Sequence, residues 1–248
     1  MVQGVSPNEQ GYLFNQAYFR DAHDYAILNA SSIREFVFGL SASAHSLADI
    51  ESFNAYQFTR DQCAFWFGDA ADTAVKAYDS FFESYLESER GIPYFIDGLT
   101  RQRGLQNLGA IKEILENGKL KERSSSASSS WGARHLADMR PPLPEPGEAI
   151  GLLETQAGHL DVSYKLIQEA AKDIADNCDE SRSRFFQENL VAQWHILYGL
   201  VNWALELERS VDALKDGNRQ KAIHPIEQSI LESKTIKKGQ AFVTSNPR

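Results

Sequence analysis

The sequence predicts a mainly α protein, a helical bundle with at most one short strand near the N-terminus. Apolar residues recur at steps of three and four over long stretches, which is the period of helices with one buried face. Glycines stand just after several of these stretches, where helices commonly end. Only one short apolar run, residues 25–29, has the character of a buried strand.

The composition divides the 248 residues into five parts. We expect an extended lead-in at 1–30, a helical lobe at 31–118, a loop or linker at 119–147, a bundle of three long helices at 148–238 and an extended tail at 239–248. The linker contains a flexible Ser-rich run and a stiff Pro-rich run. Because both ends are predicted as extended, an excised piece of a longer protein and a complete chain are equally good interpretations.

The helical lobe begins with a capping box formed by Ser32 and Glu35. In this motif the Ser hydroxyl accepts from the backbone N–H three residues on, and the Glu carboxylate reaches back to the cap. The helix behind the box is predicted to bury one apolar face. That face consists of Ile33, Phe36, Val37, Leu40, Ala44 and Leu47.

Three more helices are predicted before the linker. One spans residues 56–67 and ends at Gly68, and the next is capped by Asp69 and ends near residues 90–91. The last spans residues 99–117 and ends at Gly118. The predicted apolar faces are Ala71, Ala74, Tyr78, Phe81, Phe82 and Tyr85 in the second helix, and Leu108, Ile111 and Leu115 in the third.

The bundle at 148–238 carries the most regular apolar pattern. Its seven-residue repeat predicts helices that pack lengthwise against near-antiparallel neighbours. Glu208 interrupts the repeat of the second helix once, and Pro225 either starts or kinks the last helix. The stripes are Ile150, Leu153, Ala157, Leu160, Tyr164, Ile167, Ala171 and Ile174, then Leu190, Trp194, Leu197, Val201, Ala204 and Val211, and finally Ile223, Ile226, Ile230 and Ile236.

The composition also bears on partners. A formal net charge of −9, with no cluster of Lys and Arg, argues against nucleic acid and anionic membrane surfaces as partners. No run of 18 apolar residues is present, so no membrane span is expected. Cys63 and Cys178 each lie among apolar helical residues, which favours buried free thiols over a disulfide.

Motifs for chemistry are missing from the sequence. None of the six histidines stands in a metal-binding pair, so no metal is expected, and His195 beside Trp194 is interpreted as a core or boundary residue. Neither a nucleophile elbow nor a phosphate loop is present, and no cofactor is expected. Carboxylate pairs such as Glu206 and Glu208 are interpreted as parts of solvated helix faces.

One group in the linker could bind a ligand. Trp131, Arg134 and His135 lie close together among small residues. An indole can stack on a sugar ring, and a guanidinium can bind a carboxylate with two hydrogen bonds. The interpretation that we favour is an anchor that holds the loop against the helices, with substrate binding as the alternative.

Three segments resemble a known family. Residues 24–35, an apolar run that ends in Asn29 and is followed by a polar turn, resemble the end of the last barrel strand in family 115 glycoside hydrolases, the xylan α-glucuronidases and their relatives. Residues 65–71 resemble the helical domain behind that barrel, where a Phe-Gly turn precedes an Ala-rich helix that ends in Tyr-rich positions. Residues 185–193 are similar to the family's next long helix.

This resemblance implies an accessory helical domain of a glycoside hydrolase. Residues 1–30 would hold the tail of a barrel, and Asn29 would lie near the substrate, because barrel enzymes place their chemistry at the carboxyl ends of strands. Asn29 is equally well interpreted as a turn residue. The implied partners are an upstream catalytic domain of the same polypeptide, a second copy of the chain and a polysaccharide, and the implied location is secreted or periplasmic.

Two other functions compete with this one. The first is a non-catalytic α-helical scaffold or interaction protein, which fits the regular seam and the missing motifs. The second is a bundle that binds a small molecule in an aromatic cavity. The residues expected to line that cavity are Tyr56, Phe65, Trp66 and Phe82.

Overall fold

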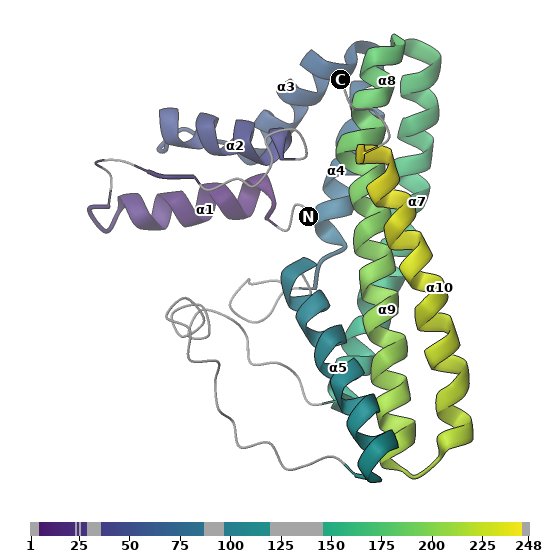
Figure 1. Cartoon of the computed structure of the whole chain (residues 1–248). Coiled ribbons are helices and arrows are strands. Elements are labelled where there is room, and N and C mark those ends of the chain that lie inside the picture. Colours follow the sequence, from purple (N-terminus) through teal and green to yellow (C-terminus); the bar gives the residue numbers. More distant parts are fainter. Residues whose placement is uncertain are drawn as a thin grey trace. The chain divides into compact units, whose positions relative to one another are not determined.

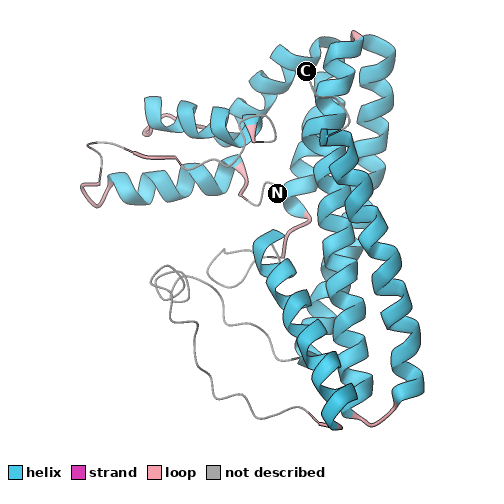
Figure 2. Ribbon diagram, in the orientation of Figure 1, coloured by secondary structure: helices cyan, strands magenta, loops and turns pink. Residues whose placement is uncertain are grey.

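The computed structural model describes residues 5–22, 24, 26–28, 36–86, 97–119 and 146–244. Every regular element among these residues is a helix, so the predicted mainly α class is confirmed (Figures 1 and 2). The chain forms two compact units. Unit 1 consists of Met1–Ser84, Leu160–Ile196 and Lys238–Arg248, and unit 2 consists of Tyr85–His159 and Leu197–Lys237.

Unit 1 is built largely from short helices with clear caps. The Ser6 hydroxyl caps α1 by accepting from the Glu9 N–H at 3.1 Å, and the Asn54 side chain caps α3 by accepting from the Gln57 N–H at 2.9 Å. Gly68 ends α3 with a φ of 55°, which an L side chain rarely adopts. The elements are α1 (Pro7–Tyr18), α2 (Val37–Ala48), α3 (Ala55–Phe67), the 3₁₀ turn Gly68–Ala70, α4 (Ala71–Glu83), the later part of α7 (Pro146–Asn177), α8 (Glu180–Phe186), the π-helical turn Gln187–Val191 and the first residues of α9 (Ala192–Lys215).

Aromatic rings dominate the core of unit 1. The Phe38 and Tyr78 rings stack with their centroids 4.4 Å apart, and Phe186 packs edge-on against Phe67 at 5.6 Å. All four side chains are fully buried. As predicted, Ala74, Tyr78 and Phe81 lie on the buried face of α4.

The N-terminal part of unit 1 corrects two predictions. Residues 7–18 form α1 instead of an extended lead-in, because Pro7 and the Ser6 cap favour the start of a helix. Residues 26–28 form no strand, and Ile27 is 83% exposed. A buried strand needs a neighbouring strand for its backbone hydrogen bonds, and the described residues contain none.

Helix α2 buries a different face from the predicted one. It starts at Val37, and Ala44 and Leu47, which were expected in the core, are exposed. Stacking of Phe38 on Tyr78 turns Ala42 and Ser46 inward instead. The predicted capping box falls outside the described residues. Helix α4 also ends earlier than predicted, at Glu83, where the following Ser84 hydroxyl donates to the Phe81 carbonyl.

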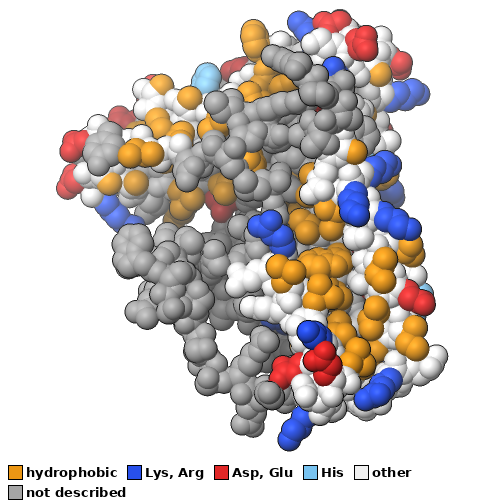
Figure 3. All heavy atoms as spheres, in the orientation of Figure 1, with side chains coloured by type: hydrophobic (Ala, Val, Ile, Leu, Met, Phe, Trp, Pro, Cys, Tyr) orange, Lys and Arg blue, Asp and Glu red, His pale blue; other side chains and the backbone are white. Residues whose placement is uncertain are grey.

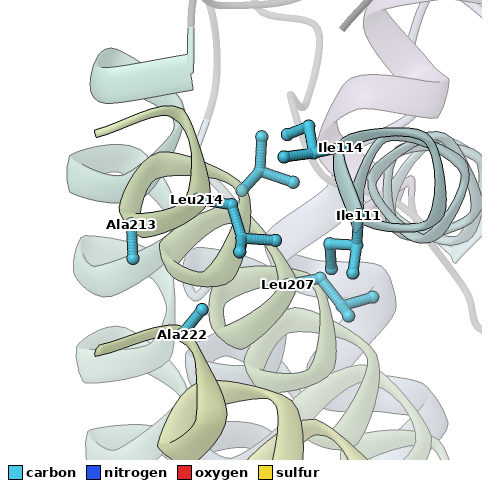
Figure 4. Packing of buried hydrophobic residues seen from close by; sticks show 7 residues of the cluster. Ile111, Ile114, Leu207, Ala213, Leu214 and Ala222 are labelled. Atoms are coloured by element: carbon cyan, nitrogen blue, oxygen red, sulfur yellow. The ribbon is translucent and has the colours of Figure 1, made fainter. Parts of the chain in front are cut away.

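Unit 2 consists of longer helices around an aliphatic core. Ile111 and Ile114 of α5 point toward Leu207 and Leu214 of α9 (Figure 4). Ala222 of α10 belongs to the same cluster. The elements are α5 (Asp97–Asn117), the first part of α7, most of α9 and most of α10 (Arg219–Thr244).

The predicted stripes of α7 and α9 are confirmed, whereas two of the three residues predicted for α5 and two of the four predicted for α10 are exposed. Leu108 and Leu115 of α5 are exposed, as are Ile223 and Ile230 of α10. Gly104 approaches the Trp203 ring so closely that any side chain there would overlap it, and this contact sets the inward face of α5. That face consists of Thr100, Gly104, Asn107, Ile111 and Ile114.

Helix α10 is also longer than predicted. It continues to Thr244, through part of the expected extended tail at 239–248. Pro225 lies inside the helix and not at its start, and the carbonyl it leaves without a partner belongs to the exposed Lys221. Small residues let the backbone of α10 approach α9: a Cβ added to Gly199 would lie 2.9 Å from the Ile236 backbone nitrogen.

Candidate functional site

None of the substrate-binding residues predicted from the sequence belongs to the part of the chain that the structure describes. Asn29, Trp131, Arg134 and His135 all lie outside the described residues. The aromatic cavity is not formed, because Tyr56 and Phe65 point into solvent and Phe65 is 76% exposed. Trp66 instead packs against Phe185 with ring centroids 4.8 Å apart.

A buried ion pair lies in unit 2. Arg103 Nε of α5 donates to Glu208 Oε1 of α9, and the two side chains are only 11% and 1% exposed. The second carboxylate oxygen, Oε2, is buried and has no hydrogen-bond partner among the described residues. Moving two charges out of water costs free energy. The attraction between these two closely placed groups offsets that cost.

This pair corrects the interpretation of Glu206 and Glu208 as a solvated pair. Glu208 occupies a position of the α9 repeat where an apolar residue would be expected, so the interruption of the stripe was the available signal. Its partner could not be found in the same way. Arg103 is 105 residues away in the sequence, and nothing nearby marks it as buried.

A second charged group links α7 and α9. Arg209 Nη1 donates to Glu206 at 2.5 Å on its own helix, and Arg209 Nη2 donates to Glu154 of α7 at 2.6 Å. On α10, burial and then the neighbouring Glu206 carboxylate raise the pKa of Glu232. Glu232 therefore holds its proton at a higher pH than an exposed glutamate, whereas Arg209 and Glu154 form a charged contact between α9 and α7.

His195 of unit 1 lies in an aromatic environment. Trp194 stacks on Tyr164 with centroids 4.2 Å apart, and its Nε1 donates to the Leu160 carbonyl at 2.9 Å. Burial, and then the charge of Lys238, lower the pKa of His195 to about 4. The imidazole is therefore neutral at pH 7, which fits the predicted core histidine.

The π-helical turn lies just before this group. It spans Gln187–Val191 and shifts the register of the helix by one residue. The buried Asn189 side chain donates its Nδ2 to the Phe185 carbonyl at 3.1 Å, which satisfies an acceptor in the disturbed ladder. The sequence contains no proline or glycine here that would have signalled the change.

The two cysteines are free thiols, as expected. Burial, and then the Asp79 charge, raise the pKa of Cys63 to about 12, so its thiol stays protonated and is a poor nucleophile. Cys178 is half-buried, and its Sγ donates to the Phe67 carbonyl at 3.1 Å. Both thiols therefore belong to the packing of unit 1.

Two further features concern metal binding and membrane insertion in the part of the chain that the structure describes. No group of three or more His, Cys, Asp or Glu side chains there could hold a metal ion. None of the described helices combines the length and the hydropathy needed to cross a membrane. Comparison with known proteins finds no matching protein family, and no similar curated protein or solved structure.

Proposed function

We propose that this chain is a helical interaction module that binds another protein through the outward faces of its unit 2 helices. The observation that carries the proposal is a set of large aliphatic side chains in solvent on α5 and α10, two helices that already bury a separate inward face. These residues are Leu105, Leu108, Leu115, Ile223, Ile230 and Leu231. Figure 3 shows hydrophobic side chains gathered at the surface over the helices of this unit.

The charged contacts of unit 2 support the same proposal. Arg103 and Glu208 bind each other, and Arg209 binds Glu206 and Glu154. The Arg103–Glu208 and Arg209–Glu154 contacts each join two helices, so these charges serve the assembly of the bundle. Grouped aliphatic side chains at the surface of a folded domain are typical of a protein-binding surface.

The test is the size of the native assembly. The chain purified from the cells that produce it should elute with a partner, above the mass of one chain, in size-exclusion chromatography with light scattering. A folded variant with serine at Leu108, Leu115, Ile223 and Ile230 should elute alone. A wild-type chain that elutes alone at its cellular concentration would contradict the proposal.

We also propose a more specific setting, in which the partner is the catalytic barrel of a glycoside hydrolase and this chain is its accessory helical domain. The support is the resemblance of residues 65–71 and 185–193 to family 115. Residues 65–71 cover the end of α3, the turn at Gly68 and the start of α4. The barrel-strand part of the resemblance does not contribute, because residues 26–28 form no strand.

An assay of the natural polypeptide tests this setting. If the setting is right, the polypeptide as the cell makes it contains a barrel before this region and releases glucuronic acid from xylan fragments. Removal of the helical region should lower the melting temperature of the barrel. A natural polypeptide that lacks a barrel would overturn this setting and leave the interaction module in place.

A further inference from the structure

The last turns of α10 pack on α9 at Gly239. A Cβ added to this glycine would lie 2.8 Å from the Ala192 carbonyl oxygen and 3.0 Å from the His195 Cβ, so the two backbones approach closely. Within residues 237–241, Gly239 is buried and the other four residues are exposed. The attachment of this stretch to α9 therefore depends on the contact at Gly239. We call residues 238–244 the α10 end.

His195 lies directly beneath this contact, in surroundings that contain little water. The residue is only 7% exposed. Its ring packs edge-on against the Trp194 ring, with centroids 5.0 Å apart, and against the Tyr164 ring of α7, with centroids 6.2 Å apart. A charged imidazole would lose its hydration here, and burial therefore favours the neutral form.

The charge next to His195 has the same effect as burial. Lys238 of α10 is the charged residue among those described whose field acts on the imidazole. The neighbours from α7 and α9, Tyr164 and Trp194, are aromatic and supply no carboxylate to compensate a second positive charge. In agreement with this geometry, burial and then the Lys238 charge lower the pKa of His195 to about 4.

We propose that His195 is a proton-sensitive latch for the α10 end: this end packs on the neutral imidazole and leaves α9 when the imidazole takes up a proton. Release lets water reach the imidazolium and lets Lys238 move away from it. The preceding part of α10 stays in place, because Ile236 packs on Gly199 of α9 almost one turn earlier. The latch lies within unit 1 and does not depend on the partner surface proposed for unit 2.

The direction of the pH response follows from the two forms. In the released form His195 is an exposed histidine with the ordinary pKa of 6.5, whereas packing under α10 lowers the pKa to about 4. Attachment of the α10 end is therefore strongest above pH 6.5 and is lost progressively as the pH falls toward 4. Between pH 7 and pH 5, the ratio of released to attached form should rise on the order of tenfold.

Hydrogen exchange of the full chain, followed by mass spectrometry from pH 7 to pH 5, tests the latch. The labelling time at each pH is scaled to the intrinsic exchange rate, so that changes in protection remain. A detached helix end frays, because packing supplies most of the stability of a helix in a protein. The protection of residues 238–244 should fall on the order of tenfold at pH 5, whereas residues 197–214 of α9 should stay protected.

Matched variants identify the groups involved. His195→Gln should keep the α10 end equally protected at both pH values, since the amide takes up no proton. Lys238→Gln should weaken the pH response, whereas Lys237→Gln, which removes the same charge from the neighbouring exposed position, should leave it unchanged. Gly239→Ala should release the α10 end already at pH 7, because the added methyl group overlaps the Ala192 carbonyl oxygen.

Several results would overturn the latch. One is equal protection of the α10 end at pH 7 and pH 5 in the wild type, and another is a loss of protection that persists in His195→Gln. A loss spread evenly over α9 and α10 would show that acid unfolds the helices together. The two lysine variants change only exposed residues and leave the core intact, so equal responses from them would refute the charge argument even if His195→Gln failed to fold.

Discussion

Arg103 and Glu208 form the most deeply buried ion pair among the described residues of unit 2. The Glu208 side chain is 1% exposed and lies on the central face of α9. Its attraction to Arg103 offsets the cost of burying both charges, so the two residues stabilise the fold only as a pair. Loss of one partner leaves the other charge buried and without compensation.

We therefore expect Glu208→Ala to lower the free energy of unfolding by about 3 kcal/mol or more, as measured by urea denaturation. The double variant Arg103→Met and Glu208→Leu should regain most of this loss, because both buried charges are removed. Lys112→Ala, which breaks the exposed pair with Glu116, should change stability by less than about 1 kcal/mol. A Glu208→Ala protein as stable as wild type would show that the ion pair contributes nothing.

His195 should make the stability depend on pH. Its folded pKa of about 4 lies below the 6.5 of an ordinary histidine, so the unfolded chain takes up this proton first as the pH falls. The contribution of the neutral imidazole is complete above pH 6.5 and is lost progressively between pH 6.5 and 4, by roughly 1 to 3 kcal/mol.

Urea denaturation of wild type and His195→Gln across this range measures the effect. The difference between the two proteins isolates the histidine from Glu232, whose raised pKa has the opposite sign and favours the folded state at low pH. The wild type should lose more stability than the variant on going from pH 7 to pH 4.5. Parallel curves would show that the imidazole titrates normally in the folded protein.

At the scale of the helices, close backbone approach distinguishes one glycine from another. Gly199 of α9 faces Ile236 of α10, and an added Cβ would lie 2.7 Å from its Cγ1 and 2.9 Å from its backbone nitrogen. Gly158 of α7 has no atom within 4 Å of the same position. The two residues are both helical, so a comparison separates packing from helix propensity.

Gly199→Ala should therefore destabilise the protein by roughly 1 to 3 kcal/mol, because α10 must move away from α9. Gly158→Ala should stabilise it by up to about 1 kcal/mol, since alanine favours the helix and meets no neighbour. Thermal unfolding followed by circular dichroism at 222 nm measures both changes. Equal shifts in the same direction would contradict the close approach of α9 and α10 at Gly199.

For the whole molecule, net charge governs which polyelectrolytes can bind. A chain with a net charge of −9 repels DNA and heparin, and the few basic residues on α5 and α10 do not reverse this. We expect no retention on heparin resin and no shift of duplex DNA at physiological salt. A stable complex with duplex DNA in a gel-shift assay at low micromolar protein concentration would contradict this expectation.

Much of the helical framework could be predicted because local signals agree with tertiary contacts. Gly68 and Gly118 end α3 and α5 as expected, and both have positive φ. The apolar stripe of α7 has no regular second stripe competing with it on the same helix. Its residues Leu153, Leu160 and Ile167 are fully buried. The candidate site could not be predicted from such local signals, because Arg103 and Glu208 come together only when α5 packs against α9.

The sequence alone was enough to predict the helical class, the ends of α3 and α5 and the buried faces of α7 and α9, since α7 and α9 each carry one regular apolar stripe. The tertiary structure decided which face of α2, α5 and α10 is buried, because these helices carry apolar residues on more than one side. In α2 the choice was made by Phe38 stacking on Tyr78, and in α5 by Gly104 against Trp203. Packing of this kind depends on shape at contacts between distant residues, and in α5 it leaves Leu105, Leu108 and Leu115 exposed.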